Sequence, residues 1–239
     1  MKKIKLFILV FALPFFTSAQ FNINNYVKQA KDAVGGKKSL SNEDVTSGLK
    51  EALTVGTNNS TASASKVNGY LNNPQIKIPF PKEAEQMEKT LRGLGMNKQV
   101  DEFVASMNHG AEEAAKSAAP IFINAIKNMT ITDGMSILKG SDTAATGYLR
   151  NQTSADLTVK FIPVIKAALE KVKVTQYWQP LVKTYNKVPF VKKQNPDLDQ
   201  YVNSKALDGL FLLISQEEFK IRKDPAAQVT DLLKKVFGQ

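Results

Sequence analysis

Two polar residues on an alanine-rich segment are the first candidates for chemistry. Asn108 and Glu112 lie four residues apart, so a helix would place both side chains on one face. They can form a polar site at the edge of the core, or they can belong to a buried hydrogen-bond network that joins helices. His109 is expected to make an exposed contact with Glu113, four residues further along.

Three further polar residues, Asp133, Arg150 and Asp208, could complete a site. Asp208 directly precedes the run Gly209–Ile214, which is apolar on every side of a helix. Its carboxylate must therefore be paired, hydrogen-bonded or protonated, and we predict that it is held for structure. A metal-independent hydrolase with buried carboxylates would be indicated if one helical cleft were lined by Asn108, Glu112, Asp133, Arg150 and Asp208.

The scarcity of cysteine and histidine excludes several kinds of site. The 239 residues include no cysteine and one histidine, so disulfides, thiolate metal centres and cysteine nucleophiles are excluded. Zinc sites usually need three or four soft or imidazole ligands, and helical di-iron sites need two histidines. No phosphate-binding glycine motif occurs either. We therefore expect no metal and no cofactor.

Positive charge is concentrated in one stretch. The chain has a formal net charge of +10, and residues 160–193 carry eight lysines against the single acid Glu170. This stretch holds the whole excess that remains once Lys2, Lys3 and Lys5 are removed with the export signal described below. Its lysines alternate with aromatic residues, a pattern that suits an anionic envelope lipid or polymer. The proposed patch consists of Lys183, Lys187, Lys192 and Lys193.

Two arguments limit that interpretation. A solvated lysine face with the aromatic residues turned inward would show the same pattern. The stretch also has no arginine, which disfavours a specific phosphate-reading site, because planar bidentate contacts favour arginine. An exported protein is not expected to bind nucleic acid.

The N-terminus has the pattern of a secretory signal peptide over residues 1–19. Lys2, Lys3 and Lys5 precede the apolar stretch Leu6–Phe16, and small residues end at Ala19. A membrane-spanning helix needs about 20 apolar residues, and no stretch of the chain reaches that length. We expect export to the periplasm or beyond, as a soluble or peripheral protein. The expected organisation is the signal peptide 1–19, a lead segment 20–39 and a helical domain 40–239.

Helical periodicity dominates the remaining sequence. Apolar stripes with a spacing of three and four residues predict an all-α, single multi-helix domain with about nine or ten helices and little or no sheet. Expected helix starts are a capping box at 41–44, caps at Thr132 before Asp133 and at Ser141 before Asp142, and a second box at 153–156. Pro120 should kink or restart a helix, and 76–80 should be an extended connector.

The helical pattern leaves two further features to interpret, a polar stretch and a pair of opposite charges. The polar stretch 57–66 suggests, by composition alone, a loop or a weak helix. Glu218 and Arg222 are four residues apart with the acid first, which predicts an ordinary salt bridge on a helix surface.

Several long blocks resemble a bacterial family of exported proteins that is defined only as a domain of unknown function. The blocks include GYLNNPQIKIPFP at 69–81, IFINAIKNMTITDG at 121–134 and NPDLDQYVNSKALDGLF at 195–211. The similarity covers about 200 residues. The resemblance implies export, a single helical domain and helical structure through 57–66, and it implies no reaction.

These observations favour a non-enzymatic, exported binding or scaffold protein of the cell envelope with a weak preference for anionic ligands. The alternative is the carboxylate hydrolase. A third possibility, a purely structural or oligomeric partner, would show a large exposed apolar patch.

The signal peptide should be cleaved between Ala19 and Gln20, because Ala19 is the small residue that ends the cleavage region. The intact mass of the exported protein should match residues 20–239, less one ammonia if Gln20 cyclises. A full-length mass in the envelope fraction would contradict the assignment.

Overall fold

The described residues of the computed structural model are 41–93, 95–171, 178, 182–183, 186, 197–224, 228, 234 and 236. The chain divides into residues 1–39 and 40–239, and all described residues lie in the second unit. The predicted signal peptide and lead segment therefore lie outside the described residues.

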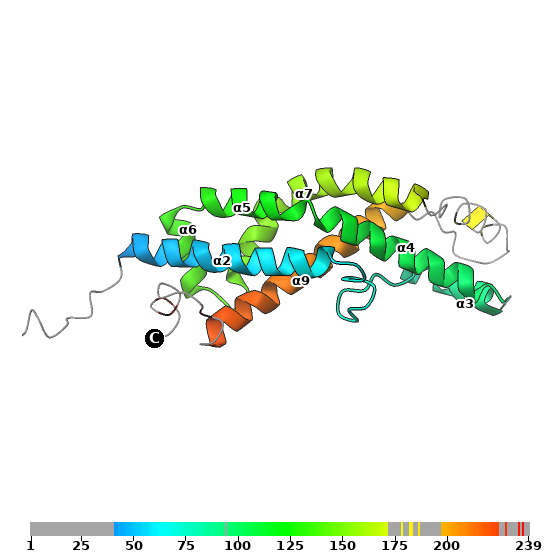
Figure 1. Cartoon of the computed structure of the whole chain (residues 1–239), viewed down its shortest axis with the longest axis horizontal. Coiled ribbons are helices and arrows are strands. Elements are labelled where there is room, and N and C mark those ends of the chain that lie inside the picture. Colours follow the sequence, from blue (N-terminus) through cyan, green and yellow to red (C-terminus); the bar gives the residue numbers. More distant parts are fainter. Residues whose placement is uncertain are drawn as a thin grey trace, which may run out of the picture. The chain divides into compact units, whose positions relative to one another are not determined.

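All regular structure among the described residues is helical, which confirms the all-α class. The predicted count of nine or ten is not matched, since these residues contain seven α-helices and one 3₁₀ helix (Figure 1). The elements are α2 (Asn42–Ser65), η1 (Lys82–Ala84), α3 (Glu85–Gly93), α4 (Asn97–Ala115), α5 (Ala118–Asn128), α6 (Ile131–Lys139), α7 (Ala144–Lys171) and α9 (Leu198–Lys223).

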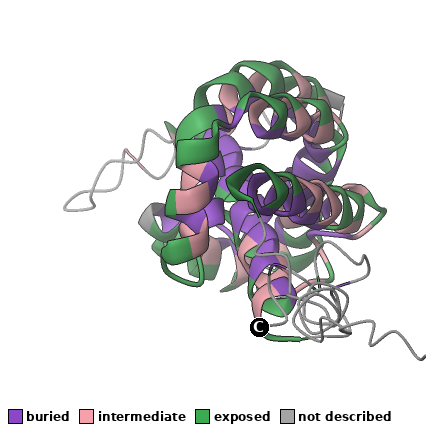
Figure 2. Cartoon of the chain, turned by 90° about the vertical axis from the view of Figure 1, so that its left-hand side faces the viewer, coloured by how far each residue is buried: buried purple, intermediate pink, exposed green. Residues whose placement is uncertain are grey.

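Helix α9 is central to the packing of the described helices. It packs against α2, α4 and α7, while α5 packs against both α2 and α7, and α6 does the same. Figure 2 shows the buried residues on helix faces that point toward one another and the exposed residues on the outer faces. The buried apolar residues of these helices form one continuous core.

Helix α2 is helical through the polar stretch 57–66, up to Ser65. The composition-based expectation of a loop is wrong, and the helix implied by the family resemblance is confirmed. The buried hydroxyls of Thr57, Ser60 and Thr61 donate to carbonyls one turn earlier, at 2.7–2.8 Å. These bonds satisfy the hydroxyls within the helix, so the polar face can be buried.

The predictions of a cap at Thr132 and of a helix start at 153–156 are wrong, whereas the cap predicted at Ser141 lies three residues before the first residue of α7. Thr130 caps α6, forming a reciprocal capping box with Asp133, and Thr132 lies inside the helix. Helix α7 begins at Ala144, so the predicted box at 153–156 lies in its interior. There the Thr153 hydroxyl donates to the Leu149 carbonyl at 2.7 Å, a bond available only inside a helix.

Other sequence predictions of local structure are confirmed. Ser41 caps α2 in a box with Asp44. Pro120 lies in the first turn of α5, where a missing N–H costs no helical bond, and α4 ends at Ala115. Residues 76–80 are a non-helical connector.

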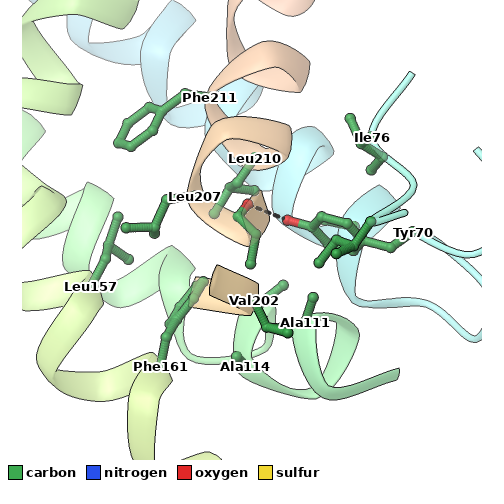
Figure 3. Close-up of a cluster of buried hydrophobic side chains, with 14 of the residues drawn as sticks. Tyr70, Ile76, Ala111, Ala114, Leu157, Phe161, Val202, Leu207, Leu210 and Phe211 are labelled. Carbon is green, nitrogen blue, oxygen red and sulfur yellow. Dashed lines mark hydrogen bonds between the residues drawn. The ribbon is translucent and has the colours of Figure 1, made fainter. Parts of the chain in front are cut away.

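The connector at 66–81 is packed into the core rather than lying on the surface. Tyr70 and Ile78 have no exposed surface, and the Tyr70 hydroxyl donates to the Ala206 carbonyl of α9 at 2.6 Å (Figure 3). Gly209 permits this close approach, because a Cβ there would lie 2.8 Å from Tyr70 Cε1 and 3.0 Å from Ile76 Cβ.

A Gly209→Ala substitution should destabilise the protein by about 1–2 kcal/mol, since the clash with two buried side chains outweighs the gain in helix propensity. Gly147→Ala is the matched control, because a Cβ at this exposed position in α7 meets nothing within 4 Å. The control should be stabilised by about 0.5–1 kcal/mol. Equal midpoints for the two variants in urea unfolding would contradict the packing described.

Candidate functional site

Glu112 of α4 is a buried carboxylate surrounded by hydrogen-bond donors. Its Oε1 accepts the backbone N–H groups of Tyr70 and Leu71, both at 3.1 Å. Its Oε2 accepts the N–H of Asn68 at 3.1 Å and lies 2.9 Å from His109 Nδ1. Because a carboxylate can only accept, this geometry favours the histidine tautomer with the proton on Nδ1. His109 therefore contacts Glu112 rather than the predicted Glu113, which pairs with Lys116.

The turn at 66–71 is shaped to direct those amides at the carboxylate. Asn68 has a φ of 60°, in the left-handed region. A Cβ on Gly69 would lie 2.5 Å from the carbonyl oxygens of Ser63 and Ala64, so only glycine fits there. Successive amides that converge in this way form an anion-binding concavity, and here the anion is a side chain of the protein itself.

Asn108, one turn before Glu112, clamps the second half of the connector. Its Oδ1 accepts the Ile78 N–H at 2.8 Å, and its Nδ2 donates to the Ile78 carbonyl at 2.9 Å. Nδ2 also donates to the Val104 carbonyl at 2.8 Å, so the fully buried amide is saturated. Asn108 and Glu112 thus lie together on one face, as their spacing indicates, in a network that joins α4 to the connector.

Tyr70 extends the network to α9. Burial raises the pKa of its phenol far above the ordinary value, and the Glu112 carboxylate raises that pKa further. The phenol therefore stays protonated and remains the donor to the Ala206 carbonyl.

Glu218 and Arg222 form a second buried network, so the prediction of a surface salt bridge is wrong. Their side chains are 4% and 10% exposed. Glu218 accepts the backbone N–H groups of Ala145 and Thr146, at 3.0 and 2.8 Å, at the start of α7. Arg222 donates to Glu218 and, at 2.9 Å, to the Ile137 carbonyl near the end of α6. The pair thereby satisfies groups that helix ends leave without partners.

Asp208 and Arg150 pair at 3.0 Å across α9 and α7. Asp208 is therefore paired, as expected, but the two side chains are 54% and 45% exposed, so the carboxylate is not buried. Arg150 also lies over the Phe211 ring, with the guanidinium carbon 4.5 Å from its centroid.

The five predicted site residues occupy three separate hydrogen-bond arrangements. Asn108 and Glu112 bind the connector, Arg150 and Asp208 pair with each other, and Asp133 caps α6. None of the three arrangements shares a hydrogen bond with another.

A polar hollow between α5, α6 and α7 contains residues that the sequence reasoning missed, with Asp133 as the one exception. Two stripes line it, with Asn124 and Asn128 on α5, and Tyr148, Gln152 and Asp156 on α7. The signal that could have revealed them is their repeated spacing of four residues.

The predicted lysine patch can be placed only in part. Lys183 is exposed, as are Lys160 and Lys166 of the same stretch. Lys187, Lys192 and Lys193 lie outside the described residues.

The described residues contain neither a membrane-spanning helix nor a cluster of metal ligands. None of their helices is long and apolar enough to cross a bilayer. Within the same residues, no three His, Asp or Glu side chains come together as ligands for a metal ion.

Comparison with known protein families gives a match over most of the chain. The model of a family described as "Protein of unknown function (DUF4197)" matches residues 39–238. No curated protein and no solved structure matches the chain.

A Glu112→Gln substitution should destabilise the protein by about 2–3 kcal/mol, because the new NH₂ group faces backbone donors inside the fold. The matched control is Glu113→Gln, whose side chain is 55% exposed and pairs only with Lys116. The control should change the free energy of unfolding by less than about 0.5 kcal/mol. Similar losses in both variants, measured by urea unfolding, would contradict the role given to Glu112.

Asp208→Ala should cost less than about 1 kcal/mol, because it removes an exposed ion pair and leaves no buried donor without a partner. Chemical unfolding measures this cost, and 1 M salt should reduce it further. A loss comparable to that of Glu112→Gln would show that Asp208 has a buried structural role after all.

Proposed function

We propose that this chain, which belongs to the DUF4197 family, is an exported, non-enzymatic binding or scaffold protein of the cell envelope with a weak preference for anionic ligands. The proposal rests on how the fold uses its buried carboxylates and on where the chain places its excess positive charge.

The observation that favours a non-enzymatic role is that both carboxylate oxygens of Glu112 already take part in hydrogen bonds within the protein. A general acid or base must reach a proton of the substrate through an available oxygen. Both oxygens of Glu112 accept backbone amides, and both oxygens of Glu218 do the same. Withdrawing either carboxylate for catalysis would strand buried N–H groups, so these two acids suit a structural role better than a hydrolytic one.

The lysine-rich stretch supports the anionic preference. Residues 160–193 hold eight lysines against one acid, and Lys160, Lys166 and Lys183 are exposed. Each lysine near an anionic surface contributes about 1 kcal/mol at best. The resulting attraction is weak and sensitive to salt.

Sedimentation with vesicles tests the proposal. The full exported chain should bind anionic phosphatidylglycerol vesicles at low ionic strength and lose most of that binding near 0.5 M salt, because screening lengths fall from about 30 Å at 0.01 M to about 8 Å at 0.15 M. Lys192→Glu combined with Lys193→Glu should weaken binding. Reversing Lys28 and Lys31, which lie outside the stretch, is the matched control and should matter less.

Equal binding to neutral phosphatidylcholine vesicles would contradict the anionic preference. Equal effects of the two double reversals would contradict the assignment to residues 160–193.

A further inference from the structure

The polar hollow between α5, α6 and α7 is built from matched helix faces. On α5 its lining is Ile121, Asn124, Ala125 and Asn128, and on α7 it is Tyr148, Gln152, Thr153 and Asp156. These spacings of three and four residues each describe one face of a helix. Asp133 of α6 completes the lining, and the volume is about 240 Å³.

Four of the polar side chains that line this hollow take no part in the hydrogen bonds of the described fold, unlike Asp133 and Thr153, which bond within their own helices. Asn124, Asn128, Gln152 and Asp156 make no hydrogen bond with any described residue, whereas the buried Asn108 is saturated by three. Three planar amides, each able to donate and to accept, therefore line one depression with their hydrogen-bonding capacity available.

Asp133 adds an oriented acceptor, and the Tyr148 phenol adds a donor. The Asp133 Oδ2 accepts the Thr130 N–H and hydroxyl, at 3.0 and 2.7 Å, which orients the carboxylate and leaves Oδ1 without a partner among the described residues. These two bonds lower the pKa of Asp133, so it stays ionised. Partial burial and then the Asp133 carboxylate raise the pKa of Tyr148, so its phenol keeps its proton.

We propose that this hollow binds a saccharide without anionic groups, one sugar ring at a time. Sugar hydroxyls donate and accept together, which matches amides flanked by a phenol and carboxylates. The volume is below the range of about 300–1,000 Å³ typical of pockets for drug-sized ligands, so one ring suits it. The described residues that line the hollow include no lysine or arginine, and the two acids among them repel an anionic sugar.

The two acids that line the hollow could instead bind a cation, but the arrangement of their oxygens disfavours this. One oxygen of Asp133 is already engaged by the cap of α6. Asp133 and Asp156 are the two acids of the lining, and no third joins them in a ligand cluster of the described residues. The saccharide site goes beyond the anionic preference proposed above, because it uses different residues and the opposite charge.

Saturation-transfer NMR on the full exported chain tests the proposal with three probes: methyl glucoside, N-acetylglucosamine and glucuronate. Both uncharged sugars should receive saturation, with dissociation constants on the order of millimolar for so small a ligand. Glucuronate should bind at least about tenfold more weakly, because its carboxylate meets Asp133 and Asp156. A magnesium titration should leave the sugar signal unchanged.

Variants locate the site. Asn124→Ala combined with Gln152→Ala should weaken binding at least about tenfold, since two pairs of hydrogen bonds are lost. Tyr148→Phe keeps the ring and should weaken binding less. Asn151→Ala, the exposed neighbour outside the lining, is the matched control and should bind normally. These side chains are exposed or half-buried, and circular dichroism should confirm that all the variants fold.

Absence of transfer to both uncharged sugars would overturn the proposal. So would equal binding of glucuronate, or a double variant that binds like Asn151→Ala. Vesicle binding through the lysine stretch should be the same in every one of these variants, so failure of this proposal is distinguishable from failure of the anionic one.

Discussion

The buried carboxylate of Glu112 is the constraint on which the arrangement of α2, α4 and α9 depends. Removing an ionised group from water costs several kcal/mol, and only a complete set of donors offsets that cost. Here the set consists of three backbone amides of the turn after α2 and the ring of His109. Fixing that turn places Tyr70 against Ala206 of α9, and Asn108 fixes the rest of the connector at Ile78.

A second buried carboxylate that accepts backbone amides lies where α6, α7 and α9 meet. Glu218 accepts the first amides of α7, and Arg222 donates to a carbonyl near the end of α6. In both networks an acid on one helix satisfies backbone groups of another segment, so the carboxylates secure connections between elements. Among the described residues, polar groups outside these networks lie at the surface, in the polar hollow and at Lys160, Lys166 and Lys183.

The sequence predicts the local features well, because these depend on neighbouring residues. The helical class, the cap at Ser41 and the restart near Pro120 follow from spacing and residue type. The continuation of α7 through 153–156 could not be predicted, because Thr153 and Asp156 have the composition of a cap while the Thr153 hydroxyl bonds within a continuing helix. The partners of Glu112 were also beyond prediction. Apart from His109, they are backbone amides more than 40 residues away, and backbone amides carry no residue-specific signal.

Hydrogen exchange at single amides tests the central role of Glu112 most directly. The account predicts that the N–H groups of Asn68, Tyr70 and Leu71 exchange only through global unfolding, although they lie in a turn outside any helix. Glu43, in the first turn of α2, has no intrahelical acceptor for its N–H and should exchange rapidly. Exchange of the three turn amides as fast as that of Glu43 would show that the carboxylate does not hold the turn, and would contradict the account.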